Sequence, residues 1–151
     1  MRAVLQRVTR AEVTVGGRIV GRIARGFVVL LGVAKGDAEA DAEYIMAKTV
    51  AMRVFADAAD KMNLALRDVG GELLVISQFT LLADTESGRR PSFIHAAPPD
   101  DARRLYELFV SLARNTGVRV ETGEFGAMMQ VALVNDGPVT IILDSKPQQG
   151  E

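Results

Sequence analysis

The sequence predicts an α+β domain with a mostly antiparallel or mixed sheet, curled toward a barrel, and two main helices. Three observations favour this class. The expected strands outnumber the helices, the two helices fall between groups of strands rather than after every strand, and no internal repeat or linker divides the 151 residues. A chain of this length has the usual size of one domain. We expect that domain over residues 1–145 and a polar tail over 146–151.

Strands are expected in both halves of the chain. Valine, isoleucine, leucine and phenylalanine gather in short stretches bounded by turn-forming residues, which is the pattern of strands. These stretches are 4–8, 11–15, 18–23, 27–33, 53–55, 72–78, 118–121, 128–134 and 139–143. The Gly16-Gly17 pair suits a two-residue hairpin turn. Residues 135–138 are expected to form another turn, between the last two strands.

The two expected helices have recognisable start signals. Asp37 is placed to cap a helix over 38–50. Its buried face would carry Ile45, Thr49 and Met52. The second helix starts at Pro98-Pro99-Asp100 and stops before Gly117. Its buried stripe would consist of Leu105, Leu108, Phe109 and Leu112. The polar segment 83–91 is expected to be a mobile loop.

Composition and charge exclude several classes of protein. Hydrophobic residues make up 48% and charged residues 25%, close to the globular average, so disorder is not expected. Apolar runs long enough for a membrane span or a signal peptide are lacking, so we expect a cytoplasmic protein without a membrane partner. The 18 basic and 19 acidic residues give a net charge of −1, so an RNA partner would depend on a local cluster of arginines.

The inventory of reactive side chains is short. With one histidine, His95, and no cysteine, the chain is expected to hold neither a metal nor another cofactor. Ser77 lacks the glycine-flanked elbow of nucleophilic serines, so His95 is expected to be a packed or capping residue. Two alternatives remain open from the residues alone. One is an esterase that uses Ser77 or Thr80 with His95, and the other is an RNA-binding or structural dimer without turnover, supported only by Arg7, Arg10, Arg89 and Arg90.

Three segments stand out against this background. They are Ser77-Gln78-Phe79-Thr80-Leu81 after a buried strand, the loop Gly88-Arg89-Arg90-Pro91-Ser92-Phe93, and Asn135-Asp136-Gly137-Pro138-Val139-Thr140. Each alone has a structural explanation, as a strand end, a solvated charge pair and a plain turn. Together and in this order they resemble the D-aminoacyl-tRNA deacylases. The resemblance includes Lys61-Met62-Asn63-Leu64 and 123–129, and it runs from Met1 to about Ser145.

The resemblance implies a homodimeric hydrolase that cuts the ester between a D-amino acid and the terminal adenosine of tRNA. The catalytic segment would be Ser77, Gln78, Phe79 and Thr80. Its backbone groups would orient the carbonyl while the neighbouring ribose 2′-hydroxyl helps to activate water. Thr80 as a nucleophile is also possible, although no adjacent base is evident to activate it.

The resemblance also implies how the two enantiomers are told apart. Gly137 and Pro138 would form a cis pair that enters the other subunit's site and excludes L-amino acids. Glycyl-tRNA, including glycine mischarged on tRNA-Ala, would then pass. The implied substrate-binding or tRNA-binding residues are Arg7, Arg89, Arg90, Pro91, Ser92, Phe93, Met128, Met129 and Asn135. Asp84 and Glu86 depart from the more basic character expected in this loop.

Overall fold

A long first strand organises the sheet. The computed structural model describes residues 1–146, so the expected polar tail lies outside the described residues except for Lys146. β1 (Arg2–Val15) pairs antiparallel with β3 (Gly26–Gly32) along its first half and with β2 (Arg18–Ile23) along its second half. Its other edge pairs antiparallel with β8 (Gln130–Asp144).

The rest of the sheet is parallel, and the sheet curls. β6 (Glu72–Ser77) joins β3 in parallel, and β7 (Val120–Thr122) joins β6 in parallel. Gly21 on β2 lies against the backbone of β7, because a Cβ built there would be 2.5 Å from the carbonyl oxygen of Thr122. The absence of a side chain permits this close approach. The two ends of the strand order therefore meet, and the predicted mixed sheet that curls toward a barrel is confirmed.

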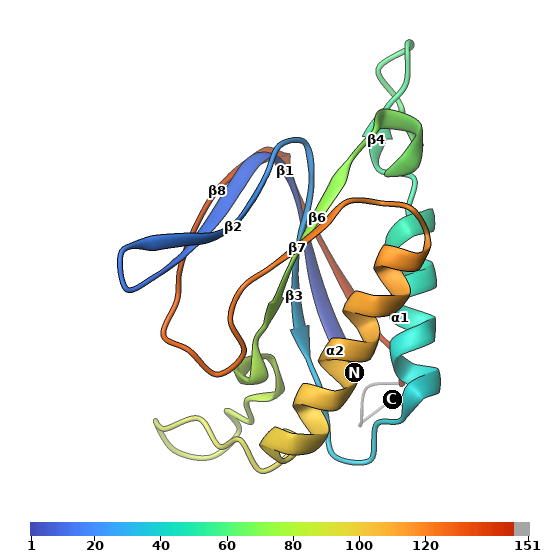
Figure 1. Ribbon diagram of the computed structural model, residues 1–151. Helices are drawn as coiled ribbons and strands as arrows, with labels where there is room; N and C mark the ends of the chain where they lie inside the picture. The colour runs from blue at the N-terminus through green and yellow to red at the C-terminus, as the bar shows by residue number, and fades with distance from the viewer. Residues whose placement is uncertain (147–151) are drawn as a thin grey trace.

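Two helices lie side by side over one face of the sheet (Figure 1). They are α1 (Glu39–Ala51) and α2 (Pro99–Asn115). The larger core lies between helices and sheet and includes the fully buried Phe27, Ile45 and Phe109. A smaller core, with Val13 and Leu74, fills the inside of the curl. The predicted pair of main helices is thus confirmed.

The remaining elements are short. β4 (Phe55–Ala56) and β5 (Met62–Leu64) form a hairpin that projects beyond the sheet (Figure 1). Two 3-10 helices, η1 (Arg67–Val69) and η2 (Phe79–Leu82), flank β6. Among residues 1–146 no helix is both long and apolar enough to cross a membrane.

Two expectations about the strands are wrong. The two strands expected over 4–8 and 11–15 are parts of one continuous strand, β1. The two expected over 128–134 and 139–143 are likewise parts of one continuous strand, β8. Because β1 pairs with β8 on both sides of this segment, residues 135–138 do not reverse the chain as a hairpin turn. They belong to a bulge: Gln6 pairs with Thr140 and Val8 with Asn135, so that Arg7 alone faces residues 136–139.

The expected start of the first helix is also corrected. Asp37 does not cap α1, because its carboxylate is occupied by the Met1 ammonium at 2.7 Å and by the Ala34 N–H at 2.7 Å. Asp41 in the first turn instead accepts the N–H of Ala38, the N-cap residue, at 2.8 Å. In the second helix Leu105 and Phe109 are buried as predicted, but Leu108 and Leu112 are only half-buried. Tyr106, Val110 and Ala113 complete that buried face.

Candidate functional site

The first candidate segment lies where β6 ends. Ser77 is the last residue of β6, and η2 begins two residues later. The N–H of Gln78 donates to the carbonyl of Leu31 on β3 at 2.9 Å. Next to Leu31, Gly32 leaves no side chain beneath the turn, and a Cβ there would lie 2.5 Å from Leu82 Cδ2. The turn therefore packs directly on the β3 backbone.

The beginning of η2 presents two adjacent backbone donors. The N–H of Leu81 donates to Gln78 O at 3.2 Å, and that of Ala83 donates to Thr80 O at 3.1 Å. The N–H groups of Phe79 and Thr80, by contrast, donate to no other group of residues 1–146. This follows from helix geometry, since the first N–H groups of a helix have no partner within it. Both residues are exposed, so an external acceptor can reach these donors.

The Thr80 hydroxyl has no base beside it. Its oxygen accepts a hydrogen bond from Gln78 Nε2 at 2.5 Å, its one side-chain partner within residues 1–146. The expectation that His95 is packed or capping is wrong: His95 is exposed, and its Nε2 lies 3.4 Å from Asp84 Oδ2. Because the imidazole faces Asp84, no serine–histidine or threonine–histidine pair forms among the described residues. That part of the chain also contains no cluster of three acidic or histidine side chains able to hold a metal.

The second candidate segment packs against the first. The rings of Phe79 and Phe93 meet edge to face, with centroids 5.0 Å apart. Asp84 and Ser92 exchange backbone hydrogen bonds of 2.7 and 2.8 Å. These bonds close a loop over residues 85–91 that exposes Arg89, Arg90 and Pro91. The structure thus brings the segments 77–80 and 92–93 together and sets two arginines on an adjoining loop, whose mobility stays a prediction.

The third candidate segment is the bulge of β8, and its own chain holds it in place. Arg7 Nε donates to Asp136 O at 2.8 Å, and Arg7 Nη1 donates to Val54 O at 2.5 Å. Asn135 clamps the other side, since its Oδ1 accepts the N–H of Val139 at 2.7 Å. The Gly137–Pro138 bond at the crest is cis, and both residues are exposed. Contacts of Arg7 and Asn135 with RNA stay predictions.

A single chain does not bring the bulge to η2. Arg2, at the start of β1, reaches η2 through a hydrogen bond to Leu81 O at 3.0 Å. Arg7, which holds the bulge, lies five residues further along the same strand, a span of roughly 17 Å. The donors of Phe79 and Thr80 and the Gly137-Pro138 pair therefore lie at different ends of the sheet.

The two candidate methionines differ. Met128 is 89% exposed. Met129 is half-buried and packs against the smaller core, with its sulfur where a Cβ on Gly123 would be 2.6 Å away. Only Met128 is therefore freely presented to solvent.

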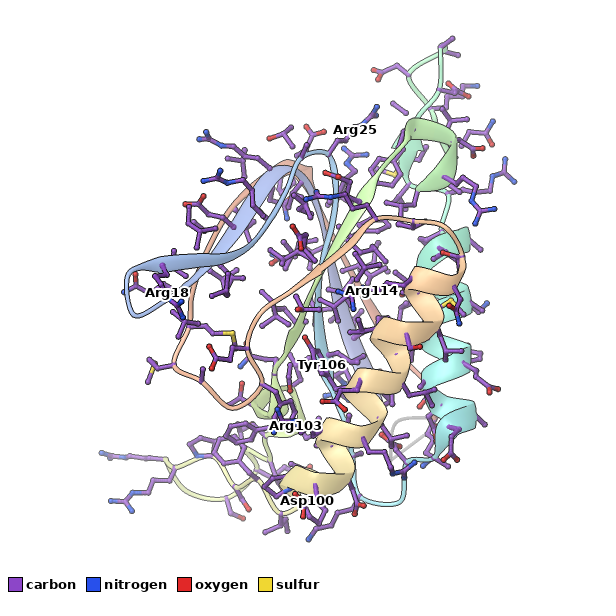
Figure 2. The ribbon with its side chains drawn as sticks, in the orientation of Figure 1. Arg18, Arg25, Asp100, Arg103, Tyr106 and Arg114 are labelled. Carbon is purple, nitrogen blue, oxygen red and sulfur yellow. The ribbon has the colours of Figure 1, made fainter. Side chains whose placement is uncertain are left out.

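An aromatic cluster beside β6 was not anticipated from the sequence. Tyr106, on the side of α2 that faces the strands (Figure 2), donates its hydroxyl to Val75 O at 2.8 Å. Burial raises the pKa of Tyr106 to about 12. The Phe125 ring lies 5.8 Å from the ring of Tyr106, and the Arg103 guanidinium lies 5.5 Å from the centre of the Phe125 ring. The sequence signal that could have revealed this cluster is the position of Tyr106 on the apolar stripe of α2.

Comparisons with known proteins identify the family of the chain. The family model described as D-Tyr-tRNA(Tyr) deacylase matches residues 4–144. A D-aminoacyl-tRNA deacylase of Dehalococcoides mccartyi is 60% identical over 146 residues, which cover 97% of this chain and 95% of the relative. The chain belongs to the D-Tyr-tRNA(Tyr) deacylase family. The predicted family and the predicted enzyme class, a D-aminoacyl-tRNA deacylase, are confirmed.

Two solved structures share the fold of this chain. A protein titled c-Myc DNA Unwinding Element Binding Protein superposes with a TM-score of 0.92 at 42% identity, covering 97% of this chain and all of its own (100%). A probable eukaryotic D-amino acid tRNA deacylase gives a TM-score of 0.81 at 18% identity, over 94% of this chain and 97% of its own. This second likeness bears on the fold alone.

Proposed function

We propose that this deacylase hydrolyses the ester of D-aminoacyl-tRNA at η2, with backbone donors as its main catalytic groups. The observation that supports the proposal is the pair of unpartnered N–H groups on Phe79 and Thr80. When water attacks the ester carbonyl, negative charge develops on the carbonyl oxygen. Two preorganised donors stabilise that charge, and one such donor can be worth ~3 kcal/mol. An ester is activated enough to need no strong side-chain nucleophile.

The substrate supplies the groups that the protein lacks. The ribose 2′-hydroxyl lies next to the scissile ester and helps to activate the attacking water. Gln78 holds the oxygen of the Thr80 hydroxyl, which leaves the hydroxyl proton free to donate. The paired rings of Phe79 and Phe93 form an apolar wall against which the terminal adenosine can pack. Arg89 and Arg90 contact the RNA backbone from the adjoining loop, and a tRNA substrate places the reaction in the cytoplasm.

The catalytic unit in this proposal is a homodimer. Within residues 1–146 the outer edge of β8 has no partner strand. That strand also exposes three apolar side chains: Val131, Val134 and Ile142 are 37%, 41% and 62% exposed. A long apolar edge is a liability in a monomer, and a second copy removes the liability by covering it. The same pairing would carry the bulge of one subunit to η2 of the other.

The bulge then acts as a chiral gate, by which we mean Gly137 and Pro138 together. Their carbonyl oxygens would occupy the space into which an L side chain projects, whereas a D side chain points away. Such a gate works by exclusion, so glycyl-tRNA is also hydrolysed. Gly137 suits this place because its φ is +141° and because a Cβ there would be 2.8 Å from Val139 Cγ2.

One substitution pair tests the backbone donors directly. Phe79→Pro removes the N–H of Phe79 at the first position of η2, where proline is tolerated. Phe79→Ala removes the same ring but keeps the donor. We expect the proline variant to lose a further ~10²–10³-fold in kcat relative to the alanine variant. Equal rates for two folded variants would contradict a role for this donor.

The substrate class is tested by charging tRNA with D-Tyr, L-Tyr or Gly and following the ester at neutral pH. We expect loss of D-Tyr and Gly and retention of L-Tyr. Hydrolysis of all three would support an esterase that uses Ser77 or Thr80 with His95. Hydrolysis of none would support a binding protein without turnover.

Mixed dimers test whether the gate crosses between subunits. One subunit carries Phe79→Pro, and the other carries Gly137→Ala, which crowds Val139 and Arg7. In a cross-subunit arrangement the intact η2 faces the intact gate, so D-selective hydrolysis returns at one site of the dimer. If each gate served its own subunit, the only intact η2 would face the altered gate and selectivity would not return.

A further inference from the structure

Arg2 connects the catalytic turn to the first and last strands of the sheet. Its Nη1 donates to Leu81 O in η2 at 3.0 Å, and its Nε donates to Asp144 Oδ1 at the end of β8 at 2.8 Å. The backbone of Arg2 pairs with Gly32, the residue on which η2 packs. The Arg2 side chain therefore links the turn to β1 and β8, while its backbone pairs with β3.

The other anchors of η2 lie at its two ends. Gln78 N–H holds the beginning to Leu31 O, and the backbone bridge between Asp84 and Ser92 follows the end. Between them, within residues 1–146, Arg2 is the side chain that hydrogen-bonds the η2 backbone. The surface below offers no side chain, because it is Gly32. Together with the packing of the Phe79 ring on Phe93, the bond from Arg2 therefore fixes the orientation of the turn about its axis.

We infer that Arg2 is a positioning residue for deacylation, and this inference rests on the proposed role of η2. By fixing Leu81 O, Arg2 sets the direction in which the Phe79 and Thr80 N–H groups point. Arginine suits this task because its planar fork donates to two acceptors in fixed directions, whereas a lysine ammonium is a single point of charge. Misplacement of a catalytic group by about 1 Å can cost about a hundredfold in rate.

The experiment compares Arg2→Met and Arg2→Lys by single-turnover deacylation of D-Tyr-tRNA, with KM measured in parallel. We expect kcat to fall about tenfold to a hundredfold in Arg2→Met and less in Arg2→Lys, with KM unchanged. Adding Phe79→Pro to Arg2→Met should then lower kcat by a much smaller factor than adding it to the parent. The reason is that the Phe79 N–H is already misdirected in Arg2→Met. Such non-additivity is not produced by a structural role unrelated to the donors.

Lys146→Met is the matched control. Lys146 lies at the same end of the sheet and pairs with Asp37 and Asp41 at 3.0 and 3.7 Å, but its hydrogen bonds go to residues outside η2. We expect this variant to lose thermal stability while it keeps kcat.

An unchanged kcat in Arg2→Met, with an active parent, would overturn the positioning role. A raised KM with unchanged kcat would also overturn it, and would show that Arg2 binds RNA directly. A parent without D-Tyr-tRNA hydrolysis would overturn the proposed function itself.

Discussion

At the scale of single residues, the site depends on side chains that hold backbone in place. Gln78 holds Thr80, Asn135 closes the bulge, and Arg7 ties the bulge to Val54. The family resemblance implied Arg7 as a substrate or tRNA contact, and a guanidinium is a common phosphate ligand. Its actual bonds go to two backbone carbonyls of distant segments, and no local pattern reveals such partners. The sequence singled out three segments for the proposed site, but it could not predict the hydrogen-bond partners of their side chains.

We predict that His95→Ala and Ser77→Ala keep most of the deacylase activity. Neither side chain donates to or accepts from Thr80, and His95 faces Asp84. Loss of a true triad member costs about 10⁴-fold or more, so a change below about tenfold in kcat is expected here. Loss of all hydrolysis in folded His95→Ala would favour the esterase alternative.

We also predict an acid-dependent contribution of Asp41 to stability. Partial burial opposes its ionisation, but hydrogen bonds from Ser145 and Ala38 and the charge of Lys146 outweigh it and lower the pKa of Asp41 below 3.8. A lowered folded-state pKa contributes stability that is complete above the unfolded value and is lost as the pH falls through the folded value. Asp41→Asn should therefore lower Tm at neutral pH, and the difference from the parent should shrink below about pH 3.8. A constant difference down to pH 2 would contradict this.

At the scale of elements, β1, β3 and β8 determine where η2, the proposed catalytic turn, and Gly137-Pro138, the proposed gate, lie. The existence of most strands and of α2 could be predicted from their strong apolar patterns, and that of α1 from its strong helix formers. The continuity of β8 could not, because Asn135-Asp136-Gly137-Pro138 has the composition of a turn. The pairing with β1 makes β8 continuous, since β1 pairs with residues on both sides of the bulge. Tertiary pairing here overrides a local signal.

Gly32→Ala and Gly21→Ala distinguish general destabilisation from damage to the turn. A Cβ at Gly32 would be 2.5 Å from Leu82 Cδ2 and 3.0 Å from Gln78 O, so it pushes η2 off the sheet. A Cβ at Gly21 would be 2.5 Å from Thr122 O, at the contact between β2 and β7. Both variants should unfold at lower temperature, but only Gly32→Ala should lower kcat of the folded enzyme, by about tenfold or more. Equal kcat values in the two variants would contradict the role of Gly32.

At the scale of the whole molecule, the proposed site is complete only in a dimer. The fold class was predictable from the order of strands and helices. The separation of the gate from η2 was not, because it depends on which ends of the strands carry the two segments.

If the proposed homodimer forms through the β8 edge, Val134→Glu should convert it to a monomer. The substitution places a charge on the exposed apolar edge of β8, whereas Ile19→Glu places one on β2, where Ile19 is 47% exposed. Sedimentation equilibrium should show a monomer for the first variant and a dimer for the second. D-selective deacylation should be lost in the first variant and kept in the second. A Val134→Glu dimer of parental affinity would rule out the β8 edge as the interface.

The pairing of β1 with β8 also constrains how the enzyme is made. β1 leaves the ribosome well before β8, yet the two strands pair from Arg2 with Asp144 to Thr14 with Gln130. One edge of β1 therefore stays unpaired until β8 has been synthesised, and such late, non-local pairing slows folding. Arg2 meets Asp144 only at this last step. A truncated chain that ends before β8 would expose that edge, and it would lack both the gate and one of the two acceptors that orient Arg2.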